Sequence, residues 1–146
     1  MPIYDSGCTG YVHGPESTAL VDFCQPPTSA VLDLGSGTGA VALTIAHRFR
    51  GVEAHLVDLQ PEMVEASDRN RRALHIPGSA RLGDVRRPQA LPHAELVVAN
   101  PPFFDRDHGR VSANPVKRRA THAVDGTLED FVCAGATCMT DDGWCW

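Results

Sequence analysis

The sequence predicts an α/β fold, in which an open, doubly wound sheet of parallel strands is truncated after about four or five strands. Two observations predict it. Short apolar runs alternate along the chain with longer segments of helical period, as repeated strand and helix units do. The clearest run, Ala30–Leu34, leads directly into the glycine-rich turn Gly35–Gly39, as a buried parallel strand does before the next helix.

Three segments have the apolar spacing of helices. Ala40–Arg48 follows the glycine turn and is ended by Gly51, a residue common just after helices. Glu62–Leu74 follows Pro61, and proline is favoured at the first helical position. Leu128–Met139 carries apolar side chains four residues apart.

Three more strands are expected, each with a polar residue at its carboxyl end: Ala54–Asp58, Ala80–Leu82 and Glu95–Ala99. Pro101 and Pro102 forbid further pairing after the last of them. Asp141–Gly143 is expected to form a turn, so that Trp144–Trp146 could only begin a fifth strand. Residues 1–146 are therefore expected to form a single, C-terminally incomplete domain.

Composition excludes several classes of protein. With 42% hydrophobic and 21% charged residues among 146, the chain is neither collagen-like, disordered nor a coiled coil. It lacks an apolar run of the roughly 20 residues that cross a bilayer, and it does not start as a signal peptide does. We therefore expect a cytoplasmic protein without a membrane partner.

Cysteines and histidines do not predict a metal site. The five cysteines include no C-x-x-C pair, so reduced thiols are expected. The seven histidines lack the spacing of zinc ligands, so we expect no bound metal.

Charge is unevenly distributed. The net charge of -5 argues against binding nucleic acid through bulk charge. However, one part of the long loop expected over residues 105–125 is basic, and either forms a solvated loop or contacts substrate phosphates. This basic stretch contains Arg106, Arg110, Lys117, Arg118 and Arg119.

The glycine turn predicts a site for a cofactor. Gly35, Gly37 and Gly39 allow a ligand to approach the backbone closely, and the next helix offers its amides to an anionic group. The spacing departs from the dinucleotide pattern G-x-G-x-x-G, but Ala40 in the third glycine position is compatible with that pattern. NAD therefore remains a competing cofactor on this evidence.

Two acidic residues follow neighbouring strands. Asp58 lies about 20 residues beyond the glycines, where a carboxylate can accept both hydroxyls of a ribose. Asp84 ends the third strand and is suited either to an adenine amino group or to capping the next turn.

Asn100–Phe103, with the sequence N-P-P-F, is the motif that distinguishes the possible functions. The Asn100 side-chain oxygen and the Pro101 carbonyl can accept hydrogen bonds from an amine whose lone pair faces an electrophile. Phe103 could stack on a planar substrate. The alternative without a function is that the two prolines end the strand in a loop and the phenylalanines pack in the core.

Together, Val31–Gly39, Asp58, Asp84 and Asn100–Phe103 resemble the class I S-adenosylmethionine-dependent methyltransferases that carry an N-P-P-[FY] motif. More narrowly, segments along nearly the whole chain look like the tRNA1(Val) adenine N6-methyltransferase family. These segments are Gly10–Gly14, Ser17–Phe23, Val57–Pro61, Val98–Phe104 and the stretch from His122 through Leu128 to Asp130.

The resemblance implies a Rossmann-like sheet and S-adenosyl-L-methionine as the cofactor. It implies that Asp33 and the glycine turn face the methionine part, Asp58 the ribose and Asp84 the adenine. Residues 1–24 would cover the cofactor, and Tyr11 is expected either to line its pocket or to pack.

For the acceptor, the resemblance implies that Asn100, Pro101 and Phe103 hold an adenine of a tRNA anticodon loop for methylation at N6. Pro102, Phe104 and the basic stretch are the expected substrate contacts. Two alternatives stay open. One is methylation of a glutamine N5 in a release factor, which uses N-P-P-Y and a separate N-terminal recognition domain. The other is an inactive, truncated fragment that binds the cofactor.

Overall fold

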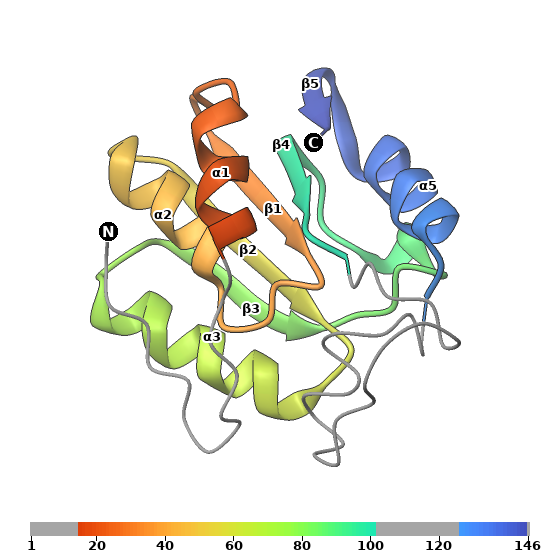
Figure 1. The fold of residues 1–146 in the computed structure, drawn as a ribbon, viewed down its shortest axis with the longest axis horizontal. Coiled ribbons are helices and arrows are strands. Elements are labelled where there is room, and N and C mark those ends of the chain that lie inside the picture. The colour runs from red at the N-terminus through yellow and green to blue at the C-terminus, as the bar shows by residue number, and fades with distance from the viewer. Residues whose placement is uncertain (1–14, 102–125, 146) are drawn as a thin grey trace.

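The computed structural model describes residues 15–101 and 126–145 (Figure 1). The helices are α1 (Pro15–Phe23), α2 (Ala40–Arg48), α3 (Pro61–Ala73) and α5 (Leu128–Cys138), with a short 3-10 helix η2 (Pro88–Ala90). The strands are β1 (Ala30–Leu34), β2 (Glu53–Asp58), β3 (Gly78–Leu82), β4 (Ala94–Ala99) and β5 (Met139–Cys145).

All five strands belong to one parallel sheet in the order β3-β2-β1-β4-β5. Strand order therefore reverses between β1 and β4, which is where open α/β sheets bind ligands. The carboxyl ends of these two central strands lie side by side, since Leu34 pairs with Ala99. The expected doubly wound α/β fold is confirmed.

Helices cover both faces of the sheet (Figure 1). Along β1, successive side chains point to opposite faces. Val31 packs in the core beneath α1 and α2, whereas Leu32 and Leu34 pack in a second core with Ala134 of α5. The central strands are buried on both sides, which explains their continuous apolar runs.

Most predicted elements lie where the sequence placed them, and Ala40–Arg48 matches α2 at both ends. The turn predicted at Asp141–Gly143 is wrong, because these residues lie inside β5. The turn chemistry instead produces an irregularity: Ala94 pairs with Met139 but Leu96 pairs with Trp144, so β5 bulges opposite β4. The fifth strand consequently begins at Met139 rather than Trp144.

Within residues 15–101 and 126–145, no helix is both long and apolar enough to span a bilayer. Four of the cysteines fall in this part of the chain, and all are free thiols: Cys24, Cys133, Cys138 and Cys145. Cys8 lies outside the described residues.

Candidate cofactor and acceptor site

The glycine turn after β1 takes a backbone path that needs glycine. Gly35, Gly37 and Gly39 have φ of 70°, 54° and 85°, in the left-handed region that other residues avoid. The amides of Gly35 and Ser36 both donate to the carbonyl oxygen of Val57, each over 2.9 Å. The turn is thereby attached to β2 before it enters α2.

Asp58 braces this turn from the end of β2. Its Oδ2 accepts the Gly37 amide over 2.9 Å, and its Oδ1 accepts the Gln60 amide over 2.9 Å. Asp58 is buried, and burial raises the pKa of its carboxyl although these amide bonds oppose the shift. Each oxygen already holds a backbone amide, so binding of a ribose by Asp58 would use the remaining lone pairs and stays a prediction.

Asp33 lies beneath the turn, on the face that α2 covers. Its side chain is buried, and Oδ2 accepts the Ala42 amide over 3.2 Å. Burial, with a smaller contribution from the charge of Asp58, raises the pKa of Asp33 to about 7. The floor of the site therefore holds a carboxyl that gains or loses its proton near neutral pH.

A pocket opens between the glycine turn and the end of β4. It brings together three residues predicted for the cofactor, Asp33, Gly35 and Gly37, with Asn100, which is predicted for the acceptor. The complete lining is Ser17, Asp33, Gly35, Ser36, Gly37, Thr38, Ala40, Val41 and Asn100. Residues predicted to bind the cofactor and a residue predicted to bind the acceptor therefore line one pocket, although Asn100 lies far along the chain from the glycines.

Asn100 is held at the rim of this pocket by α1. Its Nδ2 donates to Ser17 Oγ over 3.2 Å. No other described residue forms a hydrogen bond with the Asn100 side chain, so its Oδ1 has no donor within residues 15–101 and 126–145. Pro101 follows and is partly buried.

Asp84 is not part of this pocket. Its carboxylate forms a two-pronged contact with Arg86, from Nε over 2.8 Å and Nη2 over 2.7 Å, and it also accepts the Arg86 amide over 3.0 Å. The Arg86 guanidinium is the main reason that the pKa of Asp84 is low. This geometry favours the turn-capping alternative for Asp84, and a contact with the cofactor adenine stays a prediction.

Several pocket residues were missed by the sequence analysis. Ser36 and Thr38 lie within the glycine motif, so their place in the sequence could have predicted that they line the pocket. Ser17 carried no such signal, because its partner Asn100 is 83 residues away. The Ser36 hydroxyl is 8% exposed and has no hydrogen-bond partner among the described residues, so it is a buried polar group available to a ligand.

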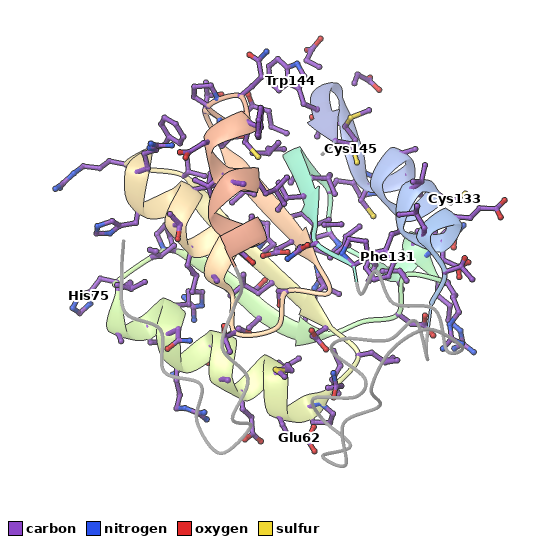
Figure 2. All side chains as sticks on the ribbon, viewed as in Figure 1. Glu62, His75, Phe131, Cys133, Trp144 and Cys145 are labelled. Atoms are coloured by element: carbon purple, nitrogen blue, oxygen red, sulfur yellow. The ribbon has the colours of Figure 1, made fainter. Side chains whose placement is uncertain are left out.

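An aromatic ring was also missed beside the turn. Phe131 projects from α5 toward the sheet (Figure 2). A Cβ added to Gly35 would lie 3.2 Å from its ring carbon Cε1. Glycine is thus favoured at position 35 by its backbone angle, and a larger residue would also press on the Phe131 ring.

The remaining predicted site residues lie outside the described part of the chain. They are Tyr11, Pro102, Phe103, Phe104 and the basic stretch Arg106, Arg110, Lys117, Arg118 and Arg119. Within the described ranges, His, Cys, Asp and Glu side chains do not gather in threes as metal ligands would.

Comparison with known families agrees with this geometry. The family model described as the methyltransferase small domain matches residues 15–125. The chain belongs to this family. The family's cofactor is S-adenosyl-L-methionine, so the cofactor inferred from the motifs is confirmed at this level and NAD is set aside.

The relatives of this chain fall into two groups, and the names of the two groups state different methyl acceptors. The chain is 32% identical over 115 residues to the release factor glutamine methyltransferase of Aliivibrio fischeri, covering 75% of this chain and 40% of that protein. It is 34% identical over 118 residues to the tRNA1(Val) (adenine(37)-N6)-methyltransferase of Tolumonas auensis, covering 77% and 48%. The chain therefore spans about half the length of the curated relatives it matches.

Solved structures agree on the fold. A methyltransferase from Thiobacillus denitrificans, solved with S-adenosyl-L-homocysteine, superposes with a TM-score of 0.62 at 18% identity, covering 96% of this chain and 51% of that one. One from Geobacter sulfurreducens, with the same ligand, gives a TM-score of 0.60 at 17% identity, covering 99% and 49%.

Residues of the pocket fit the cofactor of the methyltransferase small domain family. The start of α2 lines the pocket through Ala40 and Val41, and the first amides of a helix have no partner within the helix, which suits the carboxylate of an amino acid. The unpartnered Ser36 hydroxyl offers one further hydrogen bond. The Asp33 carboxyl lines the pocket and favours a cationic group when it is ionised.

Proposed function

We propose that this chain transfers a methyl group from S-adenosyl-L-methionine to the exocyclic N6 of an adenine in tRNA. The observation that carries the proposal is the position of Asn100 at the rim of the pocket lined by Gly35 and Gly37. Methyl transfer in line needs the acceptor nitrogen and the donor held together, and this pocket joins the groups suited to each.

The acceptor side depends on Asn100 and Pro101. An exocyclic amine shares its lone pair with the ring, so it attacks poorly until hydrogen bonds from its N–H groups hold the nitrogen in a geometry that takes the lone pair out of that conjugation. Asn100 Oδ1 and the Pro101 carbonyl oxygen are two acceptors for these N–H groups, and proline restricts the backbone that presents the second. They would aim the lone pair toward the pocket.

The donor side depends on the glycine turn. The acceptor nitrogen would bond to the methyl carbon as the carbon–sulfur bond of the bound cofactor breaks. The positively charged sulfur would leave as a neutral thioether, and the methylated nitrogen would lose one proton to water. The amides at the start of α2 and the Ser36 hydroxyl would bind the methionine part, and Asp58 fixes the turn through Gly37. The protein would then mainly orient the two reactants, which by itself lowers the barrier of a bimolecular reaction.

The choice of tRNA adenine over other acceptors is supported by two features of the sequence. The basic stretch between residues 106 and 119 suits contacts to phosphates beside an extruded base. Phe103 provides a ring for stacking. Relatives named as tRNA1(Val) methyltransferases match over 77 to 80% of the chain, which is compatible with this choice.

A second candidate acceptor is the side-chain amide of a glutamine in a release factor. The observation that favours it is the 32% identity to a release factor glutamine methyltransferase. The same two acceptors, Asn100 Oδ1 and the Pro101 carbonyl, suit the N–H groups of an amide as well as those of an adenine.

Radiolabelled methyl transfer separates the two candidates. The chain is incubated with S-adenosyl-L-methionine labelled in the methyl group, and with either bulk tRNA or a purified release factor. We expect label in tRNA, in N6-methyladenosine after digestion to nucleosides. Label in the release factor alone would replace tRNA by glutamine as the acceptor, and cofactor binding with no transfer to either would contradict the proposal in favour of a binding fragment.

A further inference from the structure

The Asn100 side chain has two chemically different ends, and one of them is already occupied. Its Nδ2 donates to Ser17 Oγ over 3.2 Å, while no described residue donates to its Oδ1. Both side chains line the same pocket as the glycine turn. With respect to residues 15–101 and 126–145, the acceptor end of the carboxamide is therefore the end left for a bound molecule.

Ser17 is itself fixed in place. It is 5% exposed and lies in α1, which packs against α2 through Val21 in the buried core. At the end of the helix, the Cys24 amide donates to the Leu20 carbonyl over 3.2 Å. A buried hydroxyl on a packed helix is a firm anchor, because moving it would disturb the core.

The need for such an anchor follows from the chemistry of an amide. An unrestrained Asn side chain rotates about its broad terminal torsion and presents its NH₂ as often as its oxygen. An NH₂ facing the N–H of an acceptor amine would set donor against donor. A carboxamide whose plane is held by Ser17 can instead meet the amine with Oδ1, at no reorganisation cost during reaction.

We propose that Ser17 is a positioning residue for methyl transfer, whose hydroxyl holds the Asn100 carboxamide so that Oδ1 faces the acceptor nitrogen. This inference rests on the proposed function, in which Asn100 holds the acceptor. It extends that function to α1, a helix that precedes the glycine motif.

Three variants test the role of Ser17. Ser17→Ala removes the hydroxyl, and Ser17→Thr keeps it. Ser67→Ala is the matched control, because Ser67 is likewise a buried serine in a helix, and its Oγ donates locally to the Val64 carbonyl over 3.1 Å in α3. We expect kcat to fall about tenfold in Ser17→Ala, with the Kd of S-adenosyl-L-methionine within about twofold of wild type.

The rescue and the control give the result its meaning. We expect Ser17→Thr to stay within about threefold of the wild-type kcat, since the anchoring hydroxyl is retained. Ser67→Ala is expected to keep the wild-type kcat. A Ser17→Ala variant that loses stability as Ser67→Ala does, but keeps its kcat, would overturn the positioning role.

A second measurement does not depend on any acceptor. In a nitrogen-15 spectrum, the Asn100 side-chain NH₂ signals are assigned by their loss in Asn100→Ala. We expect them to exchange faster with solvent and to shift in Ser17→Ala but not in Ser67→Ala. If the wild type transfers no methyl group, the proposed function fails while these signals still report whether Ser17 holds Asn100, and unchanged signals in Ser17→Ala would overturn the inference.

Discussion

The Asp58 carboxylate accepts the Gly37 amide over 2.9 Å, so the end of β2 is bonded to the middle of the turn that follows β1. Because of this hydrogen bond, the acid at the end of β2 holds the glycine turn in place even when no ligand is bound. A buried carboxylate that receives two backbone amides shapes the loop that a cofactor would contact.

Replacing Asp58 with Ala should therefore impair both folding and binding. Loss of both charge-assisted bonds, partly offset by removal of a buried charge, is expected to lower the free energy of unfolding by about 2 kcal/mol. The affinity for S-adenosyl-L-methionine should fall at least about tenfold because the turn is released. Urea unfolding and isothermal titration measure the two effects.

Asp68→Ala is the control for the loss of an acid. Asp68 bonds Arg71 and Arg72 along α3 and takes no part in the pocket. This variant should lose less than about 1 kcal/mol and keep its cofactor affinity. Equal effects of the two variants on cofactor affinity would contradict the bracing role of Asp58.

Two glycines with similar backbone angles should respond differently to Ala. Gly39 and Gly51 have φ of 85° and 91°, but a Cβ at Gly39 would lie 2.8 Å from Leu43 Cδ1, whereas one at Gly51 meets nothing within 4 Å. We expect Gly51→Ala to cost about 1 kcal/mol and Gly39→Ala about 2 to 4 kcal/mol, the difference being overpacking. Thermal and urea unfolding of both variants would show it, and equal losses would refute the steric argument.

Asp33 should make the stability of the wild type depend on pH. Its folded pKa is about 7 against 3.8 for the unfolded chain, so between these values the native state keeps a proton that the unfolded state has released. The contribution of Asp33 to the free energy of unfolding therefore falls as pH rises toward 7 and is constant above pH 7. Asp33→Asn removes the effect while keeping an acceptor for the Ala42 amide.

The stability of Asp33→Asn relative to wild type is expected to increase by about 2 to 3 kcal/mol between pH 5 and pH 8. Urea unfolding of both proteins at the two pH values measures it. A difference that is constant with pH, or that shrinks as pH rises, would mean that Asp33 is not held in its neutral form by burial.

Local signals in the sequence predicted most of the fold and singled out Asp33, Gly35, Gly37 and Asn100 among the residues that line the pocket. Gly35–Gly39 and Asn100–Phe103 each predict a loop after a strand, and parallel strands bring their carboxyl ends to the same edge of the sheet. The bulge in β5 could not be predicted, because Asp141–Gly143 has the composition of a turn and only pairing with β4 keeps it in the sheet.

The contacts that the sequence could not predict are those that depend on tertiary packing. The bond from Asn100 to Ser17 requires α1 to lie over the end of β4, and neither residue has a pattern that indicates the other. Asp84 and Arg86 are only two residues apart, but the sequence does not show whether the Asp84 carboxylate is paired with Arg86 or left free for a ligand.

Turnover by Asn100→Ala at saturating cofactor tests the central claim most directly, with the cofactor Kd measured on the same preparation. If Asn100 holds the acceptor nitrogen, kcat falls at least about a hundredfold while the Kd of S-adenosyl-L-methionine stays within about threefold of the wild-type value. Wild-type turnover in Asn100→Ala, or a loss of turnover that is explained by lost cofactor binding, would contradict the account.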